Sequence, residues 1–250
     1  MEPVVHLSAA VALLGRFPVL AGVDLDVAHQ EIVLLRGPNG AGKTSLLRAC
    51  AGLLPIVRGE ATVLGHDLRV DRHTVRRHVG LLGHGVGLHD ELTVDENVRF
   101  WGRAAHASQS DIDAALSLVG LDRRRRELVV GKLSAGQRRR TALACLLARR
   151  PRLWLLDEPH AGLDGEARDQ LDELVRRAVS QGATVLMASH ELDRAEALAD
   201  RVVELVGGMT TEPAASHAPV PPLPNGADDN GNGRPGELSR RVTQGASHVA

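Results

Sequence analysis

A glycine-rich segment near the start of the chain has the residue types and spacing of a phosphate-binding loop. Residues 37–44 read Gly-Pro-Asn-Gly-Ala-Gly-Lys-Thr and match the pattern G-x-x-x-x-G-K-[ST]. Triphosphate oxygens need several converging donors, and glycines allow the backbone N–H groups to wrap closely enough to supply them. The predicted nucleotide-binding residues here are Gly37, Pro38, Asn39, Gly40, Ala41, Gly42, Lys43, Thr44 and Ser45.

Two side chains at the end of this loop could act on the phosphates. Lys43 can reach the terminal phosphates as a point charge, and Thr44 offers a hydroxyl to Mg²⁺. Of 30 basic residues only Lys43 and Lys132 are lysines. A lysine kept in such an arginine-rich chain, such as Lys43, indicates a position where a compact ammonium is needed. The alternative interpretation is a glycine-rich loop that merely turns a strand into a helix.

A pair of carboxylates follows an apolar run later in the chain. Residues 153–156 read Leu-Trp-Leu-Leu and are followed by Asp157 and Glu158. The carboxyl end of a buried strand is the ligand edge of an open α/β sheet. Asp157 is predicted to hold Mg²⁺, and Glu158 to accept a proton from an attacking water. The alternative is a pair of solvated acids at a strand end.

Alternating strands and helices must position these residues. Strands are predicted at 4–7, 23–27 (with a turn at Gly22), 31–36, 153–156 and 184–188, and helices at 43–51, 166–180 and 193–200. This order predicts an α/β fold with a mainly parallel sheet and helices on both of its faces. The mostly helical stretch 88–150 is predicted to be an inserted helical subdomain.

The composition changes near residue 207 and suggests two regions. Residues 1–206 form the predicted body, and residues 207–250 hold six of the 12 prolines and seven glycines. We expect this tail to be disordered, with a partner-binding polyproline stretch at 219–224 as the alternative. No run approaches the roughly 20 apolar residues of a membrane span, and no signal peptide is expected.

Charge, aromatic content and cysteine content exclude several classes of protein. A net charge of −1 and 2% aromatic residues argue against nucleic acid as a partner. The two cysteines, Cys50 and Cys145, lie far apart, which excludes a disulfide framework, and both are interpreted as buried apolar residues. The arginine runs 123–126 and 138–140 are interpreted as solvated surfaces, with contact to anionic lipid as the alternative.

Residues 133–137, Leu-Ser-Ala-Gly-Gln, resemble the LSGGQ signature of the ATP-binding cassette (ABC) family. The resemblance covers residues 1–206 and implies a P-loop NTPase (RecA-like) core with an N-terminal antiparallel β portion. It implies ATP and Mg²⁺ as cofactors and an ATP-dependent head-to-tail homodimer in which the signature meets the γ-phosphate held by the other subunit. Residues 161–164 resemble the D-loop, and His190 matches the catalytic histidine of the switch region. The cofactor-binding residues that it implies are Leu133, Ser134, Ala135, Gly136, Gln137, Asp164 and His84.

Three positions depart from the family pattern. Leu14 replaces the aromatic residue that stacks on adenine, with Phe17 the only ring nearby. His84 replaces the glutamine that touches Mg²⁺ and links the site to the membrane subunit. The D-loop lacks its usual Ser or Thr.

The second departure resembles a subgroup. Residues 83–97, with Gly-His at 83–84, look like the corresponding stretch of the cytochrome c maturation haem-exporter ATPases (the CcmA group). This implies a peripheral ATPase at the cytoplasmic face of the cell membrane that drives haem export through a separate membrane permease. The alternatives are the ATPase of a multidrug or polysaccharide exporter, and a soluble ABC ATPase outside transport. DNA-repair members of that last class carry a long coiled coil between loop and signature, where this chain has only about 90 residues without sustained heptads.

Overall fold

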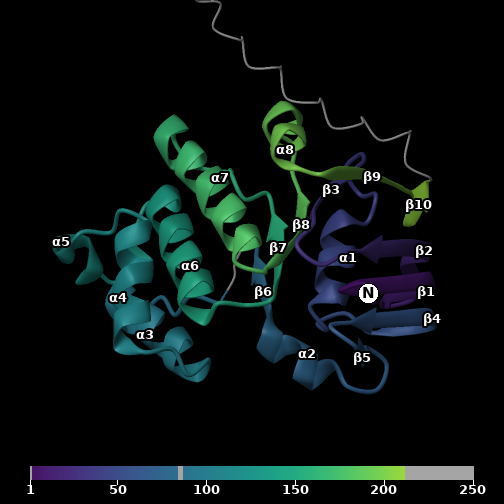
Figure 1. Cartoon of the computed structure of the whole chain (residues 1–250), viewed down its shortest axis with the longest axis horizontal. Helices are drawn as coiled ribbons and strands as arrows, with labels where there is room; N and C mark the ends of the chain where they lie inside the picture. The colour runs from purple at the N-terminus through teal and green to yellow at the C-terminus, as the bar shows by residue number, and fades with distance from the viewer. Residues whose placement is uncertain (1, 84–86, 212–250) are drawn as a thin grey trace, which may run out of the picture. The chain divides into compact units, whose positions relative to one another are not determined.

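The computed structural model describes residues 2–83 and 87–211, which build two β-sheets and the helices packed against them (Figure 1). The first sheet is antiparallel, in the order β2-β1-β4-β5. Its strands are β1 (Val5–Leu14), β2 (Phe17–Val27), β4 (Ile56–Val63) and β5 (His66–Asp67). This is the antiparallel portion expected near the N-terminus.

The predicted turn at Gly22 is wrong, because the hairpin between β1 and β2 turns at Gly15 and Arg16. Gly22 lies inside β2 with a φ of 122°, at a point where the pairing with β1 shifts register. Such a bulge places an extra residue opposite one partner and tolerates the backbone conformation that glycine adopts easily. A glycine that breaks a strand pattern therefore marked a bulge here and not the strand's end.

The second sheet has the order β10-β9-β3-β8-β7-β6 and is parallel except for β10. Its strands are β3 (Ile32–Arg36), β6 (Val79–Leu82), β7 (Leu153–Asp157), β8 (Thr184–Ala188), β9 (Arg201–Val206) and β10 (Met209–Thr211). The mainly parallel sheet expected from the sequence is confirmed. Because β3, β8 and β7 are parallel neighbours, the segments that follow them all begin at the same edge of the sheet.

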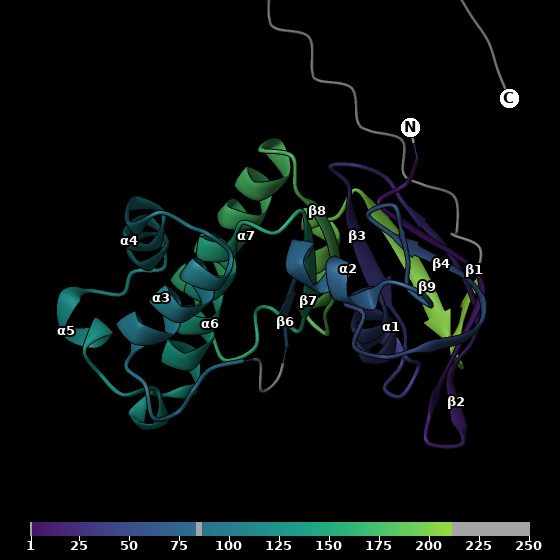
Figure 2. The ribbon, with the colours of Figure 1, turned by 90° about the horizontal axis from the view of Figure 1, so that it is seen from below.

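Helices and the antiparallel sheet cover the two faces of the parallel sheet (Figures 1 and 2). On one face, α1 (Lys43–Cys50) lies between the two sheets. On the other lie α3 (Val94–Ala104), α4 (Gln109–Leu118), α6 (Ala135–Arg149) and α7 (Gly165–Ser180). The remaining helices are α2 (Arg72–His78), α5 (Arg123–Arg126), the 3-10 turn Val130–Lys132 and α8 (Leu192–Leu198).

Two hydrophobic cores follow from this layering. Successive side chains of a strand point to opposite faces, so Leu153 and Leu155 join the core shared with α1, whereas Trp154 and Leu156 join the core shared with the long helices. Both faces are buried, which explains why β3, β7 and β8 are apolar except for one terminal residue each and show no alternation of polar residues.

The body extends beyond the predicted boundary at residue 206. Residues 209–211 form β10, which pairs with the end of β9, and Thr210 hydrogen-bonds Asp24 of β2 through its side chain. Gly208 donates its N–H to the carbonyl of Ala41 at 2.9 Å. A short strand between glycines and polar residues carries little hydrophobic pattern, so tertiary pairing decides it. The rest of the predicted tail, 212–250, lies outside the described residues.

Among the residues that the structure describes, no helix combines the length and the apolar character that crossing a bilayer requires.

Candidate nucleotide-binding site

The glycine-rich loop joins β3 to α1 and lies against the ends of two other strands. A Cβ on Gly37 would stand 2.1 Å from the carbonyl oxygen of Leu205, and one on Gly42 would stand 2.7 Å from that of Val19. Gly37 and Gly42 also have positive φ values of 150° and 106°. These two glycines therefore meet both a steric and a conformational requirement, and they place the loop at the carboxyl edge of the parallel sheet.

Lys43 is the first residue of α1, and its side chain is largely buried. Its Nζ donates to the carbonyl oxygen of Gly37 at 2.6 Å and to that of Pro38 at 3.1 Å. The ammonium is thus held across the mouth of the loop, beside the exposed residues 38–40 whose backbone the phosphates would meet. To bind phosphate, Lys43 must exchange these carbonyl oxygens for phosphate oxygens.

Thr44 and Asp157 meet although 113 positions separate them in the chain. The Thr44 hydroxyl donates to Oδ2 of Asp157 at 2.9 Å. Hydroxyl and carboxylate oxygens are the ligands that Mg²⁺ prefers, and Mg²⁺ usually completes its shell with water and substrate phosphates. Two oxygen donors that converge beside a phosphate loop fit this ion.

Glu158 directly follows β7 and turns the chain sharply. Its φ is 49°, a left-handed conformation that costs a non-glycine residue roughly 1–2 kcal/mol. Its N–H donates to the carbonyl oxygen of Ala188 at the end of β8 at 2.8 Å. The strain therefore persists because surrounding contacts hold this turn.

The carboxylate of Glu158 faces the segment that follows β8. Oε2 accepts the backbone N–H of His190 at 3.0 Å, and Oε1 lies 3.5 Å from Nε2 of its ring. The Glu158 side chain is 17% exposed and that of His190 is 59% exposed, so the pair lies at the rim of the site. Strand ends that are adjacent in the sheet thus bring together Lys43, Thr44, Asp157, Glu158 and His190, which we call the phosphate cluster.

One member of the site was missed by the sequence reasoning. The sequence predicts that Arg139 belongs to a solvated arginine run, but the structure shows that it is partly buried. Its guanidinium donates to the carbonyl oxygens of Asp157 (2.9 Å), Glu158, Pro159 (3.1 Å) and Gly83 (3.1 Å). Burial lowers the pKa of Arg139, while the neighbouring carboxylates of Asp157 and Glu158 oppose that shift. The available signal was helical spacing, because Arg139 precedes the buried Leu143 by four residues on α6.

The signature segment lies at the N-terminus of α6 and forms a second group. Ser134 caps the helix: its hydroxyl accepts the Gln137 N–H at 3.3 Å, and the Gln137 side chain accepts the Ser134 N–H at 3.0 Å. Residues 162–164 lie alongside, since a Cβ on Gly136 would stand 2.9 Å from the carbonyl oxygen of Gly162. We call residues 133–137 together with 162–164 the signature cluster.

Part of the signature cluster is exposed, including Ser134 and Asp164, and charged side chains lie beside it. Arg140 reaches Asp164 at 3.3 Å, and Arg125 lines the same shallow hollow. Among the described residues, no hydrogen bond or ion pair joins residues 37–45 to residues 133–137. The predicted site residues therefore fall into two groups within one chain.

Two of the departures from the family pattern concern Leu14 and His84. Leu14 and Phe17 pair at the end of the β1–β2 hairpin and are 65% and 77% exposed, so each is accessible to a ligand. His84 lies outside the described residues.

Comparisons with known proteins agree with this geometry. The family model described as "ABC transporter" matches residues 20–161. An Fe(3+) ions import ATP-binding protein of Streptomyces avermitilis is 41% identical over 82% of this chain, which spans 61% of that longer protein. A cytochrome c biogenesis ATP-binding export protein, CcmA of Bordetella bronchiseptica, is 39% identical over 80% of this chain and 89% of its own length.

Among solved structures, the ATP-binding subunit of an ABC transporter superposes with a TM-score of 0.77 and 28% sequence identity. The match covers 83% of this chain and 88% of that subunit.

Proposed function

The chain belongs to the ABC transporter family and contains its ATPase domain, and from this premise we propose that it hydrolyses ATP to drive a separate membrane permease. The observation that carries the proposal is the phosphate cluster. A phosphate loop, a hydroxyl–carboxylate pair and a strained glutamate beside a histidine meet at one sheet edge. We propose ATP with Mg²⁺ over GTP because ATP is the nucleotide of the family to which the chain belongs.

The proposed mechanism assigns one role to each side chain. Glu158 accepts a proton from water as its oxygen attacks the γ-phosphorus, and the bond from that phosphorus to the bridging oxygen of ADP breaks. Lys43 and His190 stabilise the negative charge that develops on the γ-phosphoryl group. Thr44 and Asp157 would hold Mg²⁺, which neutralises phosphate charge when bound.

The signature cluster supports a composite site. It presents the N-terminus of α6, whose backbone N–H groups favour an anion, but it makes no polar contact with residues 37–45 of its own chain. We propose that two copies associate head to tail, so that Ser134 of one copy faces the γ-phosphate bound by the other. Closure and opening of this dimer would move the partner permease.

We propose that haem is the cargo and that it is exported for cytochrome c maturation. A relative named as a cytochrome c biogenesis ATP-binding export protein, CcmA, is 39% identical over 80% of this chain, and the iron-import relative is similar to the same degree, at 41% over 82%. Residues 83 and 84, Gly-His, resemble the CcmA group. The proposed location is peripheral, at the cytoplasmic face of the membrane.

The ATPase proposal is tested with Glu158→Gln. The amide keeps the size of the side chain but accepts no proton, so we expect phosphate release to fall about 100-fold or more while ATP still binds. Arg138→Gln is the matched control, because Arg138 contacts Asp90 and Val130 outside the phosphate cluster. Wild-type turnover by Glu158→Gln would remove Glu158 from its role.

The cargo proposal is tested in the source organism with Glu158→Gln in place of the wild-type chain. We expect c-type cytochromes, quantified by haem staining, to fall while b-type cytochromes are retained. Co-purification from membranes should recover a permease together with cytochrome c assembly factors. Unchanged c-type cytochromes with an inactive ATPase would contradict haem export and favour the multidrug or polysaccharide alternative.

A further inference from the structure

Arg139 connects the signature helix to the backbone that carries the proton acceptor. It lies in the second turn of α6, five residues after Ser134, and its guanidinium reaches the carboxyl end of β7. Nε donates to Pro159, one terminal nitrogen donates to Asp157 and Glu158, and the other donates to Gly83 at the end of β6. Four carbonyl oxygens from two strand ends thus share one planar group.

The pattern of acceptors depends on the strained turn. In an extended strand, successive carbonyl groups point to opposite sides, so three consecutive residues cannot all face one donor. Here the carbonyl oxygens of Asp157, Glu158 and Pro159 converge because Glu158 has a φ of 49°. A guanidinium offers five donors in a fixed fork, which suits this arrangement, whereas an ammonium is a point donor on a flexible stem.

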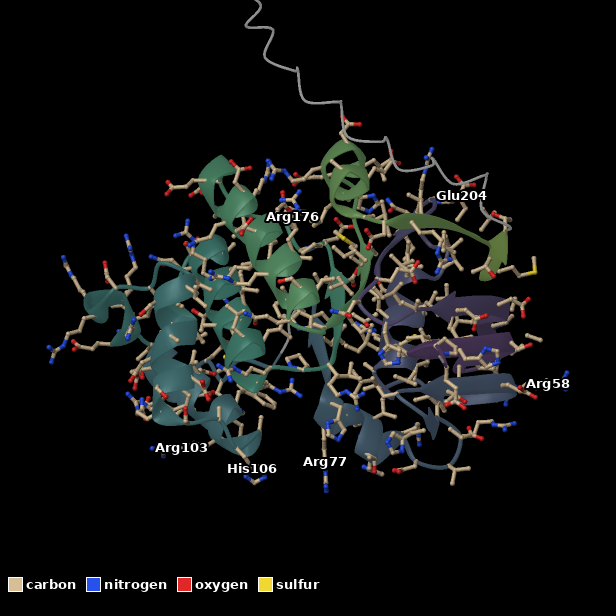
Figure 3. The ribbon with its side chains drawn as sticks, viewed as in Figure 1. Arg58, Arg77, Arg103, His106, Arg176 and Glu204 are labelled. Atoms are coloured by element: carbon tan, nitrogen blue, oxygen red, sulfur yellow. The ribbon has the colours of Figure 1, made fainter. Side chains whose placement is uncertain are left out.

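The charge of Arg139 also suits this place. The negative charges of Asp157 and Glu158 raise the pKa of Arg139 and so favour its charged form. The guanidinium nevertheless donates to their backbone oxygens, which leaves their side chains free to face Thr44 and His190. Arg149 and Arg76 also donate to backbone carbonyl oxygens but outside β7, whereas Arg58, Arg77, Arg103 and Arg176 lie on the surface (Figure 3). Arg139 therefore supports the site without occupying the positions that substrate would need.

We propose that Arg139 is a positioning residue that holds the turn at Glu158 and so aims its carboxylate for hydrolysis. The inference rests on the proposed function, because Glu158 must be the proton acceptor for its position to matter. It adds a residue on α6 to a site otherwise built from strand ends.

The test compares Arg139→Gln and Arg139→Lys with Arg138→Gln, the adjacent arginine of the same helix. Arg139→Gln should lower kcat for ATP hydrolysis about 10- to 100-fold and leave KM within about threefold, since a misplaced reacting group affects chemistry more than binding. Arg139→Lys keeps the charge but not the fork and should lose about three- to tenfold. Arg138→Gln should match the wild type.

A double variant separates positioning from a general loss of structure. If Arg139 acts through Glu158, Arg139→Gln combined with Glu158→Gln should be no slower than Glu158→Gln alone. An equal kcat for Arg139→Gln and Arg138→Gln, or a further loss in the double variant, would overturn the inference. If Arg139→Gln does not fold, Arg139→Lys is the variant that tests the inference. A kcat of Arg139→Lys equal to that of Arg138→Gln would then overturn it.

The controls distinguish this inference from the proposed function. A wild-type chain that hydrolyses ATP and a slow Glu158→Gln, together with an unimpaired Arg139→Gln, would reject only the role of Arg139. Equal turnover by Glu158→Gln and the wild type would remove Glu158 as proton acceptor and reject this inference with it. A wild-type chain that hydrolyses no ATP would reject the proposed function itself.

Discussion

The two cationic side chains Lys43 and Arg139 differ in their contacts and in their proposed roles, and their chemistry accounts for the choice of residue. Lys43 binds two carbonyl oxygens of its own loop, and a flexible stem lets an ammonium leave them for a phosphate. Arg139 binds four carbonyl oxygens through a rigid fork and is suited to stay in place. In a chain that otherwise uses arginine almost throughout, the lysine marks the position that must exchange partners.

Gly37→Ala should destabilise the protein by about 2–4 kcal/mol, because the added Cβ overlaps a backbone oxygen and alanine is strained at positive φ. The overlap is with the carbonyl oxygen of Leu205, 2.1 Å from the ideal Cβ position. Urea unfolding followed by circular dichroism measures the loss. Gly165→Ala is the control: no atom lies within 4 Å of its Cβ position, and it should be neutral or slightly stabilising.

The thiols should be unreactive in the folded protein. Burial raises the pKa of Cys50 and of Cys145 to about 12, so neither forms thiolate near pH 8. A thiol reagent at pH 8 should label less than about a tenth of the native protein in the time that labels both cysteines in guanidinium chloride. Rapid labelling of the native chain would show that the helices carrying them open.

The same two thiols give a signed effect of pH on stability. A folded-state pKa raised above the ordinary value of 9.0 means that only the unfolded chain loses these protons between pH 9.0 and about 12. Their contribution to the free energy of unfolding is therefore complete below pH 9.0 and is lost as the pH rises through that window. Replacing both cysteines by alanine should remove this part of the alkaline loss of stability.

At the scale of the elements, α3 owes its position to a polar residue in the core. Asn97 is fully buried, accepts the N–H of His89 at 2.8 Å, and donates to the carbonyl oxygens of His89 and Thr93 at 3.0 Å each. Thr93 and Glu96 close the start of the helix with a capping box. The turn before α3 is thus bonded to the helix through one amide.

Asn97→Leu should lower the free energy of unfolding by about 2–3 kcal/mol, because the buried backbone groups of the turn lose their partners. Arg103→Ala on the same helix is exposed and should change stability by less than about 0.5 kcal/mol (Figure 3). Hydrogen exchange at residues 89–93 should accelerate in Asn97→Leu alone. Equal stability of the two variants would contradict the role of the amide.

At the scale of the whole molecule, the division of the site into a phosphate cluster and a signature cluster is the main feature. Each cluster is held by its own contacts, Thr44 with Asp157 in one and Ser134 with Gln137 in the other. The N-termini of two helices in one chain, α1 and α6, thus lie at two different places. In the proposed head-to-tail dimer, a second copy would bring them to one nucleotide.

Glu158→Gln with ATP and Mg²⁺ should therefore elute as a dimer, with twice the chain mass of 26.7 kDa by light scattering. Adding Ser134→Arg should keep the chain monomeric, because a bulky side chain fills the place proposed for the partner's phosphate. Ser180→Arg at the end of α7 is the control and should still dimerise. A monomer in every nucleotide state would contradict the head-to-tail arrangement.

Residue types and their spacing along the chain are enough to predict the local features of this protein. Residue type and periodicity depend only on neighbours along the chain, and they predict the loop at 37–44, the strands at 153–156 and 184–188 and the helix at 166–180. Even the grouping of Lys43, Thr44, Asp157 and Glu158 follows, because parallel strands end at one edge.

The tertiary structure alone decided what depends on partners distant in the chain. β10 forms because it pairs with β9 and hydrogen-bonds β2. Gly22 lies at a bulge opposite β1. Arg139 is partly buried because four carbonyl oxygens converge around its guanidinium. Helical spacing indicates only that Arg139 lies on the buried side of α6, and neither this spacing nor the residues of a short polar strand reveal such partners. Their conformation is set by hydrogen bonds to residues that only the fold brings near.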